Sequence, residues 1–191
     1  MKKGIFVSFV LVGTLALSAC NMSSTTSSSS KGNGQEQKKV SEKEELTTYV
    51  NKTVPGYRDE EVSIMQKYTK AVSEDYKDDQ QLKDTLKNDI IPPYEKFYKK
   101  VSSIQLQSPE LKKAHQKYLD GINNQLTGYK SMVKLKNLTG PNAEKTKEGQ
   151  EIAQHFKQTI EDFSEYKKAV KDLADKHNIK LTTPEMPSTT N

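Results

Sequence analysis

Apolar residues in the middle of the chain recur every three or four positions, which is the spacing of one face of an α-helix. The breaks in this pattern fall at proline, glycine and serine. The alternation of apolar and polar residues that predicts β-hairpins does not occur. The pattern predicts an all-α fold, an elongated antiparallel up-and-down helical bundle of about four long helices, because short breaks join neighbouring helices.

Helix starts and helix breakers set the expected boundaries. Ser41 and Glu44 have the spacing of a capping box, which predicts a short first helix that ends at Pro55-Gly56 and packs across one end of the bundle. Ser108, followed by proline and glutamate, predicts a second well-defined helix start. The expected helices cover about residues 41–54, 58–77, 79–107, 109–138 and 143–177.

Pro92-Pro93 lies inside the third of these segments but leaves its apolar spacing in phase. A proline removes a helical hydrogen bond and restricts the residue before it, so we expect a kink or a short restart there. The last segment should form a helix of about 52 Å. Its apolar stripe is expected to include Ile160, with Tyr166 beside it. Asp162 is assigned to a charged outer face, and Glu61 to the positive amino end of the second helix.

The first 20 residues have a different pattern. Lys2 and Lys3 precede an apolar run over residues 5–19, which is shorter than the roughly 20 residues of a membrane-spanning helix. The run ends at Leu17-Ser18-Ala19-Cys20, which closely resembles the lipobox of bacterial lipoprotein precursors. The resemblance implies that residues 1–19 are a signal peptide cleaved between Ala19 and Cys20, and that the Cys20 sulfur carries a diacylglycerol thioether. A permanent membrane span and a free cysteine are the alternatives.

The resemblance also implies a domain organisation and a location. The lipidated Cys20 and the Ser/Thr-rich residues up to 40 would form a flexible tether, residues 41–181 the bundle, and residues 182–191 a disordered tail. Two acyl chains make a stable anchor, so the bundle would sit on the extracytoplasmic face of the cell membrane. Lysine greatly outnumbers the single arginine, Arg58, and this composition resembles proteins of low-GC Gram-positive bacteria, whose lipoproteins face the cell wall.

Candidate chemistry in the bundle is sparse. The three histidines, His115, His155 and His177, have no metal-ligand spacing, and no nucleophile or phosphate-binding motif occurs. We therefore expect no catalytic residue, no cofactor, no resident metal and no enzymatic activity. His115 lies in an apolar stripe, where it is either a core residue or a ligand. A metal-binding protein or metal-dependent enzyme that uses His115 is therefore an alternative.

Composition and charge narrow the remaining possibilities. Leu, Ile, Val and Phe make up about a fifth of residues 41–181, which predicts a thin core. The formal net charge of +5 falls to +3 without residues 1–19, and mixed charges with one arginine argue against nucleic acid as a partner. Tyr94 and Tyr98, beside the proline pair, and His115 are weak candidates for a contact site. We expect a non-enzymatic domain that binds an envelope protein or a cell-wall component. A structural spacer is the second alternative.

Overall fold

The computed structural model describes residues 40–140 and 142–181. The predicted signal peptide, Cys20, almost all of the tether and the predicted tail lie outside the described residues. The described elements are α1 (Glu42–Thr48), η2 (Tyr49–Thr53), α2 (Pro55–Val72), α3 (Asp79–Thr85), η3 (Leu86–Ile90), α4 (Ile91–Ser102), α5 (Pro109–Lys134), η4 (Ala143–Lys145) and α6 (Lys147–Lys176). Elements η2 and η3 are π-helical turns and η4 is a 3₁₀ turn. None of the described helices is long and apolar enough to cross a membrane.

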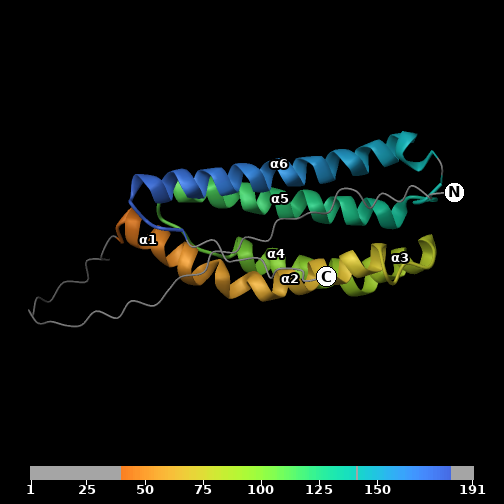
Figure 1. Cartoon of the computed structure of the whole chain (residues 1–191), viewed down its shortest axis with the longest axis horizontal. Coiled ribbons are helices and arrows are strands. Elements are labelled where there is room, and N and C mark those ends of the chain that lie inside the picture. Colours follow the sequence, from red (N-terminus) through yellow and green to blue (C-terminus); the bar gives the residue numbers. More distant parts are fainter. Residues whose placement is uncertain (1–39, 141, 182–191) are drawn as a thin grey trace, which may run out of the picture.

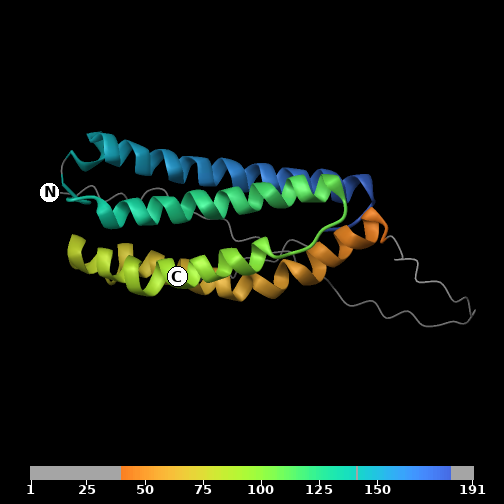
Figure 2. The ribbon, with the colours of Figure 1, turned by 180° about the vertical axis from the view of Figure 1, so that it is seen from behind.

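The chain crosses the length of the molecule four times, in alternating directions (Figure 1). Helices α1 and α2 run one way, α3 and α4 return, α5 runs out again and α6 returns beside it. Seen from behind, α5 and α6 form one layer and α2 and α4 the other (Figure 2), and α5 also packs on α4. The predicted all-α, elongated up-and-down bundle is confirmed.

The first proline does not break the helix, and the prediction of a break at Pro55-Gly56 is wrong. Helix α1 begins at the predicted capping box and leads through η2 into α2, whose first residue is Pro55. In the wider π turn the amide of Val54 donates to the carbonyl of Tyr49, five residues back, at 2.9 Å. Proline is tolerated at this position because the first turn of a helix needs no amide hydrogen. Helix α1 therefore leads through η2 into α2 and does not pack across one end of the bundle.

The second proline site is built in the same way. Element η3 precedes Ile91, and the amide of Ile91 donates to the carbonyl of Leu86, again five residues back. Pro92-Pro93 then occupies the first turn of α4. The predicted interruption is thus a π-helical turn followed by a restart of the α-helix. A π turn shifts the helix face that follows it, so each turn resets which side chains point inward.

The long helices are shorter than predicted at their ends. Helix α2 ends at Val72, before the expected Lys77, and α5 ends at Lys134. Ser108 caps α5 as predicted, but Thr146 and not a residue near Ala143 caps α6. Helix α6 has 30 residues and is therefore about 45 Å long.

The layer of α5 and α6 depends on two glycines that let the helices approach closely. A Cβ atom at Gly121 would lie 2.6 Å from Cε1 of the Phe163 ring, and one at Gly128 would lie 3.0 Å from the Phe156 ring. Phe163 is buried, whereas Phe156 is half-buried and can move aside. The apolar stripe predicted for α6 is wrong at Ile160, whose side chain is 43% exposed.

The position of Ile160 has a geometric cause. The stripe read from the sequence placed Ile160 in line with Phe156, but α6 turns the neighbouring Thr159 toward the bundle interior, where it is buried. Tyr166, expected to flank the stripe, is completely buried. A shift of one residue is enough to exchange these faces, because neighbouring helix positions lie about 100° apart.

We expect Gly121→Ala to lower the free energy of unfolding by about 1–3 kcal/mol, because the added methyl group overpacks a buried contact. Gly128→Ala should be close to neutral, since the half-buried Phe156 ring can yield and alanine is the better helix former. Gly56→Ala, which meets no atom within 4 Å, is the matched control and should be neutral or stabilising. Urea denaturation measures all three. Equal effects at Gly121 and Gly56 would contradict the close-packing argument.

Candidate functional site

The interior of the bundle is rich in tyrosine. Six tyrosines are at most 3% exposed: Tyr49, Tyr68, Tyr94, Tyr118, Tyr129 and Tyr166. Their hydroxyl groups cannot reach water, so each needs a partner inside the protein. The polar side chains that supply these partners form the most unusual chemical site in the described residues.

Glu61 is the first of these partners. It lies in the middle of α2, is 7% exposed, and accepts a hydrogen bond of 2.8 Å from the hydroxyl of Tyr118 on α5. Burial raises the pKa of Glu61 to about 7, although the hydrogen bond from Tyr118 and the charge of Lys167 act in the opposite direction. The carboxyl group is therefore largely protonated in mildly acidic solution.

The sequence prediction for Glu61 was wrong because α2 begins at Pro55 and not at Arg58. An earlier start moves Glu61 from the amino end of the helix to its interior. A signal for this was present, since Glu61 lies three residues before Ile64 and four before Met65, and both are buried on the same face.

His115 is the second partner, and its hydrogen bonds indicate which ring nitrogen carries the proton. The ring atom Nε2 lies 3.1 Å from the carbonyl oxygen of Val101, and Nδ1 lies 2.9 Å from the hydroxyl of Tyr49. A carbonyl oxygen can only accept, so Nε2 carries the hydrogen and Nδ1 accepts from Tyr49. Tyr166 in turn donates to Tyr49 at 3.1 Å. His115 is 6% exposed, and its burial lowers the pKa of the imidazole below 6.5, so the ring is neutral at pH 7.

These contacts bear on the metal alternative. Both ring nitrogens of His115 are held by protein groups, and the lone pair of Nδ1, which a metal would need, accepts from Tyr49. Within residues 40–140 and 142–181, no group of three or more His, Cys, Asp or Glu is placed to hold a metal ion.

A third branch of the network joins α4, α5 and α2. The hydroxyl of Tyr94 donates to Oε1 of Gln125 at 2.7 Å, and Nε2 of Gln125 lies 2.8 Å from the hydroxyl of Tyr129 and 3.3 Å from the sulfur of Met65. Tyr94 is 0% exposed, so the prediction that it contributes to a surface contact site is wrong. His115 is buried as well, and only Tyr98 of the three predicted residues is half-buried at the surface of α4.

Asp162 is a further polar residue that the sequence assigned to the wrong environment. It is 3% exposed and accepts from Nδ2 of Asn124 at 2.9 Å and from Nε2 of Gln158 at 3.2 Å. Lys117 lies 3.8 Å away. The charged outer face predicted for Asp162 is therefore a polar seam between α5 and α6.

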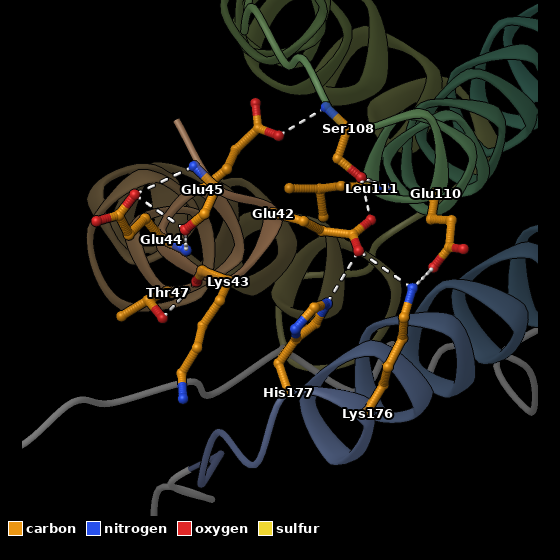
Figure 3. Close-up of polar contacts among 11 residues, drawn as sticks. Glu42, Lys43, Glu44, Glu45, Thr47, Ser108, Glu110, Leu111, Lys176 and His177 are labelled. Carbon is orange, nitrogen blue, oxygen red and sulfur yellow. Dashed lines mark hydrogen bonds and ion pairs between the residues drawn. The ribbon is translucent and has the colours of Figure 1, made fainter. Parts of the chain in front are cut away.

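At one end of the bundle, a cluster of charged side chains ties α1 to α5 and α6 (Figure 3). Glu42 accepts from the Ser108 hydroxyl at 2.5 Å, from His177 at 2.9 Å and from Lys176 at 3.1 Å, and Lys176 also binds Glu110 at 2.7 Å. We call these five residues the end cluster. The Ser108 bond, followed by those of Lys176 and His177, lowers the pKa of Glu42 to about 2.

The opposite end is fastened by Asp79. Its carboxylate accepts from the amides of Leu138 and Thr139 and from the hydroxyl groups of Thr139 and Tyr76. Partial burial opposes the ionisation of Asp79, but these hydrogen bonds outweigh it and lower the pKa. The loop after α5 is thereby joined to the start of α3.

Two surface hollows lie outside the network. One, of about 430 Å³, follows α5 and α6 near the end cluster, and the ion pairs Lys117–Glu165 and Lys176–Glu110 link the two helices along its rim. Its apolar lining consists of Ala114, Ala169 and Leu173. The other, of about 550 Å³, lies beside the loop between α5 and α6. These hollows are shallow contact surfaces, whereas Glu61 and His115 face the closed interior.

Comparison of the chain with protein-family models, with curated proteins and with solved structures finds no match. The function must therefore be argued from the residues and their geometry.

We expect Glu42→Gln to weaken the attachment of α1 and to reduce the acid sensitivity of the bundle. The folded pKa of about 2 lies below the ordinary 4.5, so ionised Glu42 stabilises the fold above pH 4.5 and loses this effect as the pH falls toward 2. Acid titration followed by circular dichroism, with hydrogen exchange in α1, measures it. Glu151→Gln, in an exposed pair with Lys147, is the control. Identical acid transitions for both variants would contradict the role of Glu42.

Proposed function

We propose that this protein is a bacterial lipoprotein, anchored in the cell membrane through a diacylglyceryl group on Cys20, whose helical bundle is a non-enzymatic binding domain. The observation that carries the proposal is the lipobox Leu17-Ser18-Ala19-Cys20 at the end of a short apolar run. The bundle would lie on the extracytoplasmic face and contact an envelope protein or a cell-wall component.

The end cluster supports this arrangement. The polypeptide enters the bundle at Ser41, and Glu42, the next residue, bonds to α5 and α6. Glu45, one turn later, accepts from the backbone amides of Gln107 at 2.5 Å and Ser108 at 2.7 Å. A force applied through residues 20–40 would thus reach three helices and not α1 alone. Such a junction suits a domain that binds a partner while held by its amino end.

The interior position of the buried polar groups favours a binding role over a catalytic one. Catalytic acids and bases must reach a substrate in a cleft. Glu61 and His115, whose pKa values are shifted by burial, bond to tyrosines and to a backbone carbonyl in the interior. The hollow along α5 and α6 offers a contact surface of the kind a protein or polymer would cover, with an apolar floor and charged rim.

We expect Cys20→Ser to abolish lipid attachment. In cells supplied with a clickable fatty acid, the natural chain should carry the label and sediment with membranes, whereas the variant should lose both properties. Ser18→Thr, which keeps the cysteine, is a control for changes near the cleavage site. Membrane retention without label, or label that persists in the variant, would contradict the proposed anchor.

A photoreactive residue at Lys113, which lines the hollow along α5 and α6, should capture a reproducible envelope partner. The same residue at Lys67, exposed on α2, is the control. Capture of random neighbours at both positions would contradict the binding role.

Replacement of the whole bundle by unrelated helices distinguishes a binding domain from a structural spacer. A spacer would keep its function after the replacement, whereas a binding domain would lose it.

A further inference from the structure

The buried network contains two groups that would both be charged in water at mildly acidic pH. In an unfolded chain near pH 5.5, a glutamate is mostly ionised and a histidine mostly protonated, since their ordinary pKa values are 4.5 and 6.5. In the folded bundle both side chains are buried, at 7% and 6% exposed, and burial favours the neutral form of each. The contacts of His115, with Nε2 at a carbonyl oxygen and Nδ1 at the Tyr49 hydroxyl, suit a neutral imidazole.

We propose that Glu61 and His115 form a proton-balanced pair, a neutral carboxylic acid and a neutral imidazole, whose opposite titrations offset each other and reduce the change in stability of the bundle in mildly acidic solution. The proposal does not depend on lipid attachment or on a binding partner. It assigns to the tyrosine network a role in pH tolerance that the packing of the helices does not by itself require.

The two groups belong to one network. Tyr118 donates to Glu61 and stacks on Tyr166 with ring centroids 5.0 Å apart. Tyr166 donates to Tyr49, which donates to His115. The rings of His115 and Tyr118 are 6.4 Å apart. The residues of this network therefore come from η2, α2, α5 and α6, and α4 contributes the Val101 carbonyl.

The surroundings of each group favour the neutral form. Glu61 faces Tyr118 on α5, Tyr94 on α4 and Tyr166 on α6, and among the described residues the positive charge of Lys167 on α6 acts on it. Lys167 is exposed, so solvent screens its charge.

Within residues 40–140 and 142–181, no charged group acts against the neutral form of His115. It contacts Tyr49, Tyr118 and the Val101 carbonyl. A second proton on Nδ1 would face the Tyr49 hydrogen, which would have to turn away and leave its present acceptor.

Proton counting gives the sign of each contribution. Between pH 4.5 and 6.5 the folded state binds one proton more than the unfolded state at Glu61 and up to one fewer at His115. Stability therefore falls with rising pH through Glu61 and rises through His115, and the two slopes oppose each other. Glu42 and Asp79, with lowered pKa values, titrate below this range.

The test is the pH dependence of unfolding of the full chain by urea between pH 4.5 and 7. The wild-type equilibrium constant should change less than that of either single variant, because the two slopes oppose each other. In Glu61→Gln, stability should rise with pH, by up to tenfold in the equilibrium constant per unit, because His115 titrates alone. In His115→Gln, stability should fall on the order of 100-fold between pH 4.5 and 7, because Glu61 titrates alone. The double variant should be nearly flat.

Asp59→Asn, on the exposed side of α2, and His155→Gln are the matched controls, and both should keep the wild-type profile. A Glu61→Gln profile that matches wild type would overturn the proposal, as would single variants that both slope in the same direction.

Spectroscopy of the unmutated chain keeps the proposal testable if His115→Gln does not fold. At pH 6, infrared spectra should contain a protonated carboxyl band that is lost in Glu61→Gln. Nitrogen-15 spectra should assign the His115 hydrogen to Nε2, with Nδ1 unprotonated. An ionised Glu61 or a doubly protonated His115 at this pH would overturn the proposal without any stability measurement.

Discussion

Every hydroxyl group in the interior of this bundle must find a partner, and this constraint organises the four long helices. A thin core built with tyrosine in place of leucine or phenylalanine gains ring area but carries a polar tip at each position. Within residues 40–140 and 142–181, no buried side-chain nitrogen or oxygen lacks a hydrogen bond. The partners come from other helices, as in Tyr118 to Glu61 and Tyr94 to Gln125, so each bond defines how one helix lies against the next. Apolar contacts alone tolerate sliding, whereas a hydrogen bond of 2.7–2.8 Å does not.

The π-helical turns bring the right residues to this network. Tyr49 is the first residue of η2, six residues before Pro55, and is 1% exposed. The wide turn places its hydroxyl between His115 and Tyr166, while α2 continues beyond the proline with Glu61 on its inner face. The close contact at Gly121 brings α5 and α6 near enough for Tyr118 and Tyr166 to stack. Proline and glycine, which weaken isolated helices, therefore serve here to set the register of the bundle.

The two ends of the bundle differ from its middle. Charged pairs join the elements there, and most of their side chains remain partly exposed, as for Lys176 with Glu110. Exposed ion pairs of this kind each contribute little to the free energy of unfolding and weaken with salt. The buried middle of the bundle therefore supplies most of the stability, and the pairs at the ends hold neighbouring elements together. Under the proposed anchor the end cluster is also the junction with the tether. Outside the cytoplasmic membrane the pH follows the surroundings, and a core that holds Glu61 and His115 in neutral forms would suit that location.

The sequence by itself determined the class of fold, the helix starts at Ser41 and Ser108, and the resemblance to a lipobox, because these are local signals in periodicity, capping and short motifs. It also indicated that His115 belongs to an apolar stripe. The tertiary structure alone decided that Pro55 continues a helix, that Ile160 faces outward, and that Glu61, Tyr94 and Asp162 are buried. These outcomes depend on which neighbouring helix supplies a partner. A glutamate, a tyrosine or an aspartate has the same local pattern at a surface as in a core, and only a hydrogen-bond partner from another helix offsets the cost of burying it.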